Sequence, residues 1–490
     1  MSFVFYDLTF LVVFCLFLIF FLRKRRKNLK REGLLYLYKT KIGIKFIGYI
    51  GKKYKKTLGV LQYVSIALGY VLMVGVFLML LKVVYTYLKS PEITEVIKAP
   101  PLVPLIPYFP NIFGVQSFFP PFYFAYFIIS ILIVATVHEF SHGIFAKAKG
   151  LKIKSTGFAF LGPFIGAFVE QDEKQMFKKP KIAQMGILSA GVFANVITAG
   201  IFILLAWGFL SLTFVQAGMV FNGYALTSIN VSSIESIGNY NIENVNADKI
   251  LDLIENEKME GNFSVSLDGK SINLAEIKAD GGAYLLSIED LKAQLEIEKS
   301  ILVVYGDFPA IRNSLRGTII ELNGVKIRNQ EDLSKELVKY KPEEEVVIKT
   351  KFNDTAILTY NLRLAESPNG NDKAFLGISS VNSNAMGFRS LIYKFFNFFE
   401  EPSTALEPKF NGDLMTFIKD LLWWIIIINF LVALFNMLPV GMLDGGRFFY
   451  LTILSIVKNE KIAGKISKFM LYLILLILLM MMVAWFIALF

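Results

Sequence analysis

The stretch TVHEFSHGIF, residues 136–145, places two histidines and a glutamate inside a long apolar run. Ionisable side chains are costly in the hydrocarbon part of a membrane, so they usually mark a functional site there. On a helix, His138 and His142 project from the same face because they lie four residues apart, and Glu139 lies beside them. Two histidines bind zinc with this spacing. The stretch therefore predicts a membrane helix that carries two metal ligands and a carboxylate.

The histidine content of the chain strengthens this prediction. The 490 residues include two histidines, and both lie in this motif. Two histidines placed at random would fall four apart, with a glutamate after the first, in roughly one of several thousand sequences. The alternative is a pair of hydrogen-bonded histidines inside a helix bundle that binds no metal. The chance argument favours the metal site.

The composition indicates an integral membrane protein. Hydrophobic residues make up 54% of the chain, which has 46 Phe and a mean hydropathy of +0.53. A helix needs about 20 apolar residues to cross a hydrocarbon core of ~30 Å. Runs of about this length predict six transmembrane helices, at residues 4–22, 58–81, 122–146, 186–212, 417–439 and 468–490. A cleaved signal peptide is the alternative for the first run, but the basic residues follow it and a small-residue cleavage site is lacking.

The net charge of +11 indicates membrane orientation and not a nucleic-acid partner. From Arg23 to Lys56 the chain has fourteen Lys and Arg and a single acid, Glu32. Positively charged loops are retained on the cytoplasmic side of membranes. Nucleic-acid sites interleave more stacking aromatics with their basic residues than this loop does. We therefore expect the loop in the cytoplasm, and both termini and residues 213–385 on the outer side.

Residues 213–385 have the composition of a soluble domain with alternating strand patterns. The second half contains a strand with its turn at Ile319–Ile327, a helix after Asn329 and a returning strand near Val346. This order resembles a PDZ domain. An opening strand at Gly218–Ser228 would make residues 229–303 an insertion, to which the pattern assigns no fold. A generic α+β domain is the alternative.

A catalytic zinc site usually has three protein ligands, so the sequence must supply a third. A third histidine is lacking, and the single cysteine, Cys15, lies in the first apolar run. Asp444 follows the fifth run, where an unpaired carboxylate would be costly. Because the third and fifth runs cross the membrane in the same direction, their ends lie at a similar depth. Asp444 is therefore the expected third ligand, and an interfacial aspartate that caps the next segment is the alternative.

Four stretches carry a family resemblance: HEFSH (138–142), KSTGFAFLGPFIGAFVEQDE (154–173), SAGVFANV (189–196) and NMLPVGMLDGG (436–446). Together they resemble the site-2 protease family of intramembrane zinc metalloproteases. The second stretch resembles the family's re-entrant β-hairpin, and the third resembles its Gly-Pro-x-x-Asn helix start. The proline-rich stretch PPLVPLIPYFP, residues 100–110, is similar to archaeal-type members. Val192 and Gly441 replace prolines that are common in the family, at positions that shape the backbone and not the chemistry.

The expected fold is an α-helical polytopic membrane protein with about six transmembrane helices, a re-entrant β-hairpin and an inserted extracytoplasmic α+β PDZ-like domain. Its expected parts are the N-terminal helices with the basic loop (1–100), the first part of the catalytic membrane core (101–212), the PDZ-like domain (213–385) and the second part of the core with the C-terminal helix (386–490).

The resemblance implies a zinc metalloendopeptidase of the cell membrane that cleaves the transmembrane segments of single-span membrane proteins. His138, His142 and Asp444 would bind one Zn²⁺ per chain. Glu139 would act as the general base. The partners expected from this reading are substrate proteins and the lipid bilayer, without nucleic acid, and the sequence assigns no oligomeric state.

Substrate contacts are expected from the hairpin and from two amides. An unwound substrate needs partners for its freed backbone groups, and it can add as a strand to the hairpin near Gly166 and Phe168. Asn195 and Asn436 could bond the remaining groups. For each asparagine, packing between helices is the alternative.

The motif and its expected third ligand distinguish this prediction from three alternative classes of protein. A transporter or receptor scaffold would also have six helices and an outer domain, but it needs neither His-Glu-x-x-His nor a membrane-depth Asp-Gly. A prenyl-protein protease shares His-Glu-x-x-His but takes a glutamate as third ligand, and the later apolar runs lack a suitable glutamate. An inactive homologue would not need to keep every catalytic group.

Overall fold

The computed structural model describes residues 3–33, 35–89, 105–108, 120–243, 245–257, 261, 263–267, 270–353, 356–368, 373–380 and 403–487. The chain divides into two compact units. The membrane unit comprises residues 1–210 and 413–490, and the inserted unit comprises residues 211–412. Most of the proline-rich stretch 100–110 lies outside the described residues.

The elements of the membrane unit follow in chain order: α1 (Phe3–Lys24), η1 (Arg26–Asn28), β1 (Leu29–Glu32), β2 (Leu35–Thr40), α2 (Ile44–Lys53), α3 (Lys55–Lys89), α6 (Phe124–Ala148), β3 (Ile153–Leu161), β4 (Phe164–Gln171), α7 (Glu173–Phe177), α8 (Lys181–Leu188), α9 (Ala190–Thr213), α15 (Gly412–Asn436), α16 (Asp444–Val457) and α17 (Glu460–Ile487).

Within the described residues, six helical segments are long and apolar enough to cross a membrane: Phe3–Lys24, Lys55–Thr86, Phe124–Ala148, Lys181–Thr213, Gly412–Asn436 and Glu460–Ile487. Each one overlaps an apolar run of the sequence, in the predicted order, and the prediction of a multi-pass membrane protein is confirmed. The fourth span is composed of α8 and α9. The last expected run ends with residues 488–490, which lie outside the described part of the chain.

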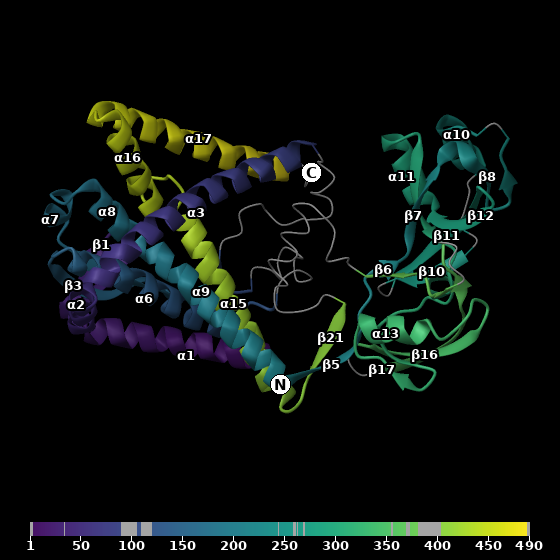
Figure 1. The fold of residues 1–490 in the computed structure, drawn as a ribbon, viewed down its shortest axis with the longest axis horizontal. Coiled ribbons are helices and arrows are strands. Elements are labelled where there is room, and N and C mark those ends of the chain that lie inside the picture. The colour runs from purple at the N-terminus through teal and green to yellow at the C-terminus, as the bar shows by residue number, and fades with distance from the viewer. Residues whose placement is uncertain are drawn as a thin grey trace. The chain divides into compact units, whose positions relative to one another are not determined.

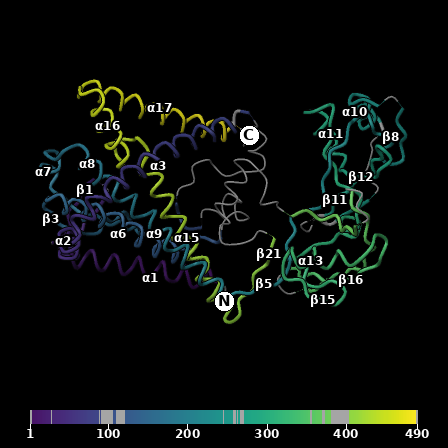
Figure 2. Tube along the Cα trace, in the orientation of Figure 1, coloured from purple at the N-terminus to yellow at the C-terminus, as the bar shows by residue number. Residues whose placement is uncertain are grey.

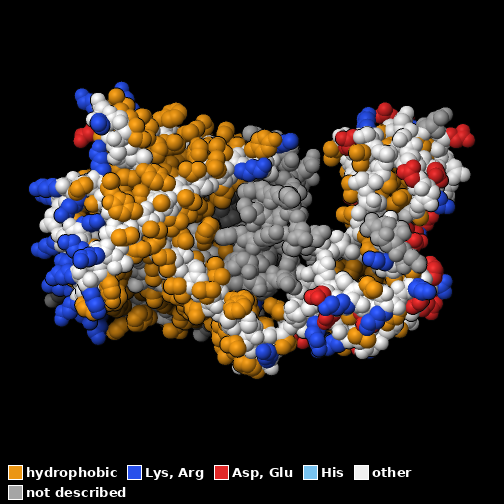
Figure 3. All heavy atoms as spheres, in the orientation of Figure 1, with side chains coloured by type: hydrophobic (Ala, Val, Ile, Leu, Met, Phe, Trp, Pro, Cys, Tyr) orange, Lys and Arg blue, Asp and Glu red, His pale blue; other side chains and the backbone are white. Residues whose placement is uncertain are grey.

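The helices differ in how much protein surrounds them. In the most apolar window of each span, 56% of the residues of α15 are buried, against 11% for α1 and 17% for α17. α15 is therefore a central helix, whereas α1 and α17 lie on the outside of the unit (Figures 1 and 2). Hydrophobic side chains form a broad belt over the unit, and Lys and Arg side chains gather at one end of it (Figure 3). This distribution suits a unit that sits in a bilayer with one basic face.

Asp7 of α1 holds the beginning of α6. Its carboxylate is 3% exposed and accepts hydrogen bonds from the backbone N–H groups of Phe124 (2.7 Å) and Ala125 (2.9 Å), and from the hydroxyl of Tyr108. The first N–H groups of a helix lack partners within the helix. A carboxylate at this end also interacts favourably with the helix dipole. α1 thus caps the helix that carries the His-Glu-x-x-His motif.

The predicted hairpin is part of a larger sheet. β3 and β4 pair antiparallel through a two-residue turn, at which Gly162 has a φ of +59°. Glycine adopts this conformation at little cost. β2 pairs with β3 and β1 pairs with β2, so the sheet has the order β1-β2-β3-β4. Strands β1 and β2 come from the basic loop, in which the sequence analysis expected no strands, and β4 is left as an edge strand. The hairpin itself is confirmed, and its entry into the membrane remains a prediction.

The elements of the inserted unit follow in chain order: β5 (Phe214–Met219), β6 (Gly223–Tyr224), β7 (Leu226–Asn230), η2 (Val231–Ser233), β8 (Ile234–Ile237), β9 (Tyr240–Asn241), α10 (Ala247–Glu257), β10 (Phe263–Leu267), β11 (Lys270–Ala279), β12 (Gly282–Ser287), α11 (Ile288–Ile297), β13 (Ile301–Gly306), α12 (Pro309–Arg312), β14 (Thr318–Leu322), β15 (Val325–Lys326), α13 (Gln330–Leu337), β16 (Glu345–Phe352), β17 (Ala356–Arg363), β18 (Ala365–Glu366), β19 (Ala374–Phe375), β20 (Ile378–Ser379) and β21 (Thr404–Pro408).

Two large sheets build most of the inserted unit, and two strand pairs, β18-β19 and β6-β20, add to them. One has the order β17-β16-β14-β5-β21, and it contains the strand, helix and strand pattern expected near β14, α13 and β16. The other has the order β7-β13-β12-β11-β8-β9 and is formed by residues that the sequence analysis left without a fold. The assignment to the PDZ class stays a prediction.

The opening strand expected at 218–228 is wrong as a single strand. Its start belongs to β5, which pairs with β14 at Met219 and Ile319, whereas its end belongs to β7, which pairs with β13 in the other sheet. The far boundary of the unit also differs from the expected residue 385. β21 pairs with β5 from Thr404 to Pro408, so the unit extends to residue 412. This pairing brings together the segment that follows α9 and the segment that precedes α15. There the Lys409 N–H donates to the Thr213 carbonyl at 2.8 Å.

Candidate metal centre

Three predicted ligands meet at one point of the membrane unit. The Nε2 atoms of His138 and His142 lie 3.0 Å apart, and both face the Oδ2 of Asp444, at 3.1 and 3.2 Å respectively. Each histidine is 6% exposed, and the Asp444 side chain is 22% exposed. Within the described residues these three side chains form a group of the kind that can hold a metal ion.

Each element delivers its ligand for a local reason. His138 and His142 lie on successive turns of α6, on the same face. Asp444 is the first residue of α16, directly after the loop that ends α15. An added Cβ at Gly445 would lie 2.4 Å from the Met437 carbonyl oxygen. The two glycines after Asp444 therefore let the first turn of α16 pack against the preceding loop, which holds the carboxylate toward the histidines.

The carboxylate of Asp444 directs its Oδ2 at both imidazoles, at 3.1 and 3.2 Å. An ionised carboxylate is the form that binds a metal ion.

A backbone carbonyl selects the tautomer of His142. Its Nδ1 lies 2.7 Å from the carbonyl oxygen of Ile187, in the last turn of α8. Carbonyls in the last turn of a helix lack a partner within that helix. The Nδ1–H group donates to this oxygen, so the lone pair of Nε2 is directed toward His138 and Asp444, as in histidines that bind metals.

Asn195 makes the corresponding contact with His138. Its side chain is 0% exposed, and its Nδ2 lies 3.1 Å from the His138 Nδ1. Its Oδ1 is buried and finds no hydrogen-bond partner among the described residues. With the amide group turned by half a turn, Oδ1 accepts the His138 Nδ1–H. The sequence analysis expected Asn195 to bind substrate, whereas the structure places it as a partner of a metal ligand.

Gly191 leaves the space that the two imidazoles occupy. A Cβ added there would lie 2.5 Å from the His142 Nε2 and 2.6 Å from the His138 Nε2. Real Cβ atoms do not approach other atoms this closely, so α9 can lie against the histidines only with a glycine at this position. Gly191 lies in the motif stretch 189–196, where the pattern alone predicts no role for it.

Glu139 lies at the junction of α6 and the edge strand β4. Its Oε2 accepts a hydrogen bond from the backbone N–H of Val169 at 3.0 Å. Gly143, one turn further along α6, allows this approach, since an added Cβ there would lie 3.0 Å from the Val169 side chain. One oxygen of the carboxylate is thereby fixed, and the other, Oε1, is left for chemistry.

A cavity of about 290 Å³ opens beside the three ligands. It is lined by Ile131, Val134, Ala135, His138, Glu139, Ala167, Val432, Asn436, Met442, Leu443 and Asp444. Two predicted ligands, the expected base and one predicted substrate contact, Asn436, thus line the same cavity. It lies between α6, β4, α15 and the start of α16.

The hairpin residue that lines this cavity is Ala167 and not Gly166 or Phe168. Backbone groups along an antiparallel strand alternate in direction. Because the Val169 N–H points to Glu139, the backbone groups of Ala167 also point away from β3, and those of Gly166 and Phe168 point toward it. The Phe168 ring lies over Gly157 of β3, where an added Cβ would be 2.7 Å away. The geometry therefore favours Ala167 over its neighbours as the hairpin's contact, and the substrate contacts of Gly166 and Phe168 stay predictions.

The donor set fits zinc. With Nδ1–H engaged on each histidine, two unprotonated Nε2 atoms and a carboxylate oxygen face one another at 3.0 to 3.2 Å. Such a group of lone pairs is repulsive unless a cation lies among them. A tetrahedral zinc with bonds of about 2.0–2.2 Å keeps its ligand atoms about 3.3–3.5 Å apart, so a shift of a few tenths of an ångström suffices.

Comparison with known proteins agrees with this centre. Residues 126–481, which contain all the residues of this centre, match the family described as "Peptidase family M50". The chain belongs to peptidase family M50. This is the site-2 protease family that the sequence motifs resemble, so the predicted family is confirmed. Membership supports a membrane metalloprotease, and family M50 enzymes depend on zinc in general.

A relative in Methanocaldococcus jannaschii, named "Uncharacterized protein MJ0971", is 32% identical over 174 residues. The matched residues are 35% of this chain and 42% of that protein, so the chain covers less than half of the relative's length. Its name assigns no activity.

Proposed function

We propose that this M50 chain is an intramembrane zinc protease that cleaves the transmembrane segments of single-span membrane proteins. The observation that carries the proposal is the convergence of His138, His142 and Asp444 beside a cavity that Glu139 also lines. The third member of the cluster is an aspartate from α16, as in the site-2 type that the motifs resemble, and this argues against the prenyl-protein type.

His138, His142 and Asp444 would hold a single Zn²⁺, which when bound would supply Lewis acidity to polarise a peptide carbonyl and to acidify water. Glu139 then takes a proton on Oε1 from the attacking water, while the Val169 N–H holds Oε2 in place. The same carboxyl group returns the proton to the leaving amine. Asn195 and the Ile187 carbonyl keep both imidazoles in the orientation that the ligands need.

The edge of β4 gives the substrate a place to unwind. A transmembrane helix buries its carbonyls in its own hydrogen bonds, and an unpaired amide in hydrocarbon costs several kcal/mol. An extended substrate can pair with the outward groups of Ala167, which lines the cavity next to the ligands. Asn436, on the opposite wall, can bond a further backbone group of the substrate. Both contacts place the scissile bond near Glu139.

We place the basic end of the membrane unit in the cytoplasm, and the termini and the inserted unit outside. The excess of Lys and Arg at one end supports this orientation (Figure 3). In this arrangement the inserted unit controls which substrates reach the site, because it precedes α15 and follows α9 directly in the chain.

The test is cleavage by the purified, reconstituted chain. A panel of single-span membrane proteins is incubated with the wild type, with Glu139→Gln and with a matched control, Glu170→Gln, whose carboxylate lies on the neighbouring hairpin and pairs with Lys39. We expect cuts within transmembrane segments that a chelator stops. Glu139→Gln should retain zinc and slow the cut by about 100-fold or more, since a general base contributes roughly 10²–10⁴. Near wild-type cleavage by Glu139→Gln would remove the base role, and a folded, zinc-loaded wild type that cuts no member of the panel would count against the function.

A further inference from the structure

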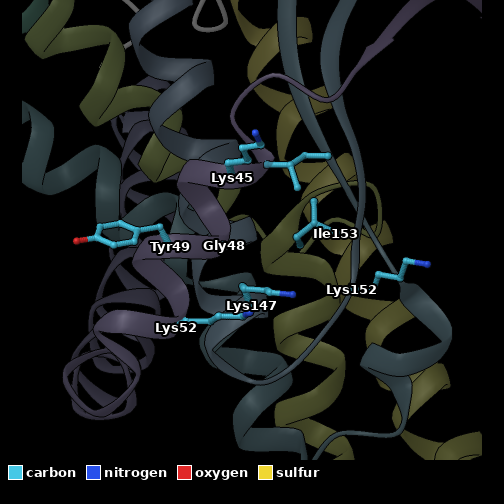
Figure 4. Close-up of a pocket in the computed structure, with 8 residues that line it drawn as sticks. Lys45, Gly48, Tyr49, Lys52, Lys147, Lys152 and Ile153 are labelled. Atoms are coloured by element: carbon cyan, nitrogen blue, oxygen red, sulfur yellow. The ribbon is translucent and has the colours of Figure 1, made fainter.

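A second cavity, of about 410 Å³, lies in the membrane unit among lysines. Its lining includes Lys45 and Lys52 of α2, Lys147 in the last turn of α6, and Lys152 just before β3. Ile44 and Ile153 supply apolar walls. Figure 4 shows Lys45 at one end of the lining, Lys52 and Lys147 at the other, and Gly48 between them on α2. We call this cavity the basic pocket, and it is separate from the metal centre, with which it shares no lining residue.

The local sequence explains why the lysines line one cavity. Lys45 and Lys52 are seven residues apart on α2, so they lie on the same face, with the small residue Gly48 between them. Ile47 is 0% exposed and anchors the opposite face against α6. At Gly51 an added Cβ would lie 2.8 Å from the Cβ of Lys147, so α2 packs closely on the end of α6. The pocket is thus built by packed helices and not by a loose loop.

The four positive charges are uncompensated by carboxylates. Among the described residues, none of the four ammonium groups forms an ion pair. Asp172, whose backbone N–H donates to the Lys152 carbonyl at 3.0 Å, uses its carboxylate to cap α7 by accepting the Gln175 N–H at 3.2 Å. Like charges held together on packed elements repel one another, and a bound anion relieves that repulsion.

The setting of the pocket indicates that the anion belongs to a lipid. The pocket lies where the membrane-spanning helix α6 ends, at the basic end of the unit beside its apolar belt (Figure 3). α2 also presents large apolar side chains outward, since its Phe46 and Tyr49 are 55% and 56% exposed, and Ile42, just before the helix, is 74% exposed. Figure 4 shows the Tyr49 side chain directed away from the lysines. A short helix with apolar and basic faces lies in the membrane interface, at the level of the headgroups.

We propose that the basic pocket binds the phosphate-bearing headgroup of an anionic phospholipid. The headgroup phosphate lies among Lys45, Lys52, Lys147 and Lys152, and the glycerol and the start of the acyl chains follow the apolar surface of α2. A lipid held there joins α2, the end of α6 and the start of β3.

The test measures binding of single lipids to the full chain. Purified protein in a neutral detergent is titrated with phosphatidylglycerol or with phosphatidylcholine, and the first bound lipid is counted by native mass spectrometry. The pocket variant is Lys45→Gln/Lys52→Gln. The matched control is Lys41→Gln/Lys56→Gln, which removes the same charge from exposed positions of the same basic segment outside the pocket. Zinc content and thermal unfolding confirm that each variant is folded.

We expect the wild type to bind phosphatidylglycerol more tightly than phosphatidylcholine. Each basic residue near a membrane surface contributes about fivefold to the affinity for anionic lipid, so the pocket variant should weaken phosphatidylglycerol binding by at least about tenfold. The control should change it by less than about threefold. Equal losses in both variants would show a diffuse surface effect and overturn the proposal. Displacement of the lipid by millimolar inorganic phosphate would assign the pocket to a free anion and overturn it as well.

Discussion

Gly191→Ala tests most sharply how the helices form the metal centre. The added Cβ would lie 2.5 to 2.6 Å from ring atoms of both histidines, and ordinary contacts begin near 3.4 Å. Either α9 or the imidazoles must therefore move by about 0.8 Å. Metal sites tolerate ligand displacements of about 0.2 Å. We expect zinc affinity to fall at least ~100-fold, more than the 10–100-fold loss seen when a residue behind a ligand is removed.

The same helix offers a control that isolates this effect. Gly200→Ala adds the same methyl group to α9, but no described atom lies within 4 Å of its Cβ. Replacing glycine with alanine in a helix stabilises it by about 1 kcal/mol, so this variant should unfold at the wild-type temperature or slightly above it. In Gly191→Ala, overpacking costs about 1–3 kcal/mol and cancels or exceeds that gain.

Zinc affinity is measured by competition with a chromophoric chelator, and stability by thermal unfolding in detergent. If Gly191→Ala bound zinc within about threefold of Gly200→Ala, the imidazoles would not lie against α9 as described. The unfolding curve distinguishes a local loss of zinc affinity from a loss of zinc that is caused by global unfolding.

Three further outcomes follow from described contacts. Asn195→Leu should weaken zinc binding about 10–100-fold, whereas Asn195→Asp, which retains an acceptor for the His138 Nδ1–H, should keep most of it; equal affinities in the two variants would contradict the contact. Asp7→Ala should lower stability by about 1–3 kcal/mol because it leaves the first N–H groups of α6 unpaired, with Asp7→Asn intermediate, and thermal unfolding checks the order. Replacing residues 214–408 by a short linker should keep zinc and allow longer, untrimmed substrates to be cut, because the Lys409 N and Thr213 O lie 2.8 Å apart and the helices on either side need not move. A folded, zinc-loaded deletion that cuts no substrate would replace the gatekeeping role with substrate delivery.

The parts of the fold that the sequence predicts are those governed by local patterns. The lengths of the apolar runs are sufficient to locate six spans, because a helix must match the thickness of the hydrocarbon core. The four-residue spacing of His138 and His142 places both on one helix face without tertiary information. The expectation that Asp444 meets the histidines agrees with the 3.1 and 3.2 Å between its Oδ2 and their Nε2 atoms, and it needed only the direction in which the runs cross the membrane.

The parts that escape prediction depend on which elements become neighbours. Nothing in the pattern around residues 29–40 shows that β1 and β2 would extend the hairpin. A glycine that must be small against two imidazoles, as at Gly191, looks in sequence like any small residue in a membrane helix. Which hairpin residue directs its backbone groups outward depends on the direction of one N–H group, that of Val169. The strand pattern predicts how side chains alternate, but it does not predict which edge of the sheet stays unpaired.

The zinc content of the purified wild type and of Asp444→Ala tests the central claim most directly. The account predicts about one zinc per wild-type chain, held by two imidazoles and one carboxylate, and a loss of most of it when the carboxylate is removed. Full retention of zinc by a folded Asp444→Ala would contradict the ligand set, because α16 would then contribute nothing that the metal needs.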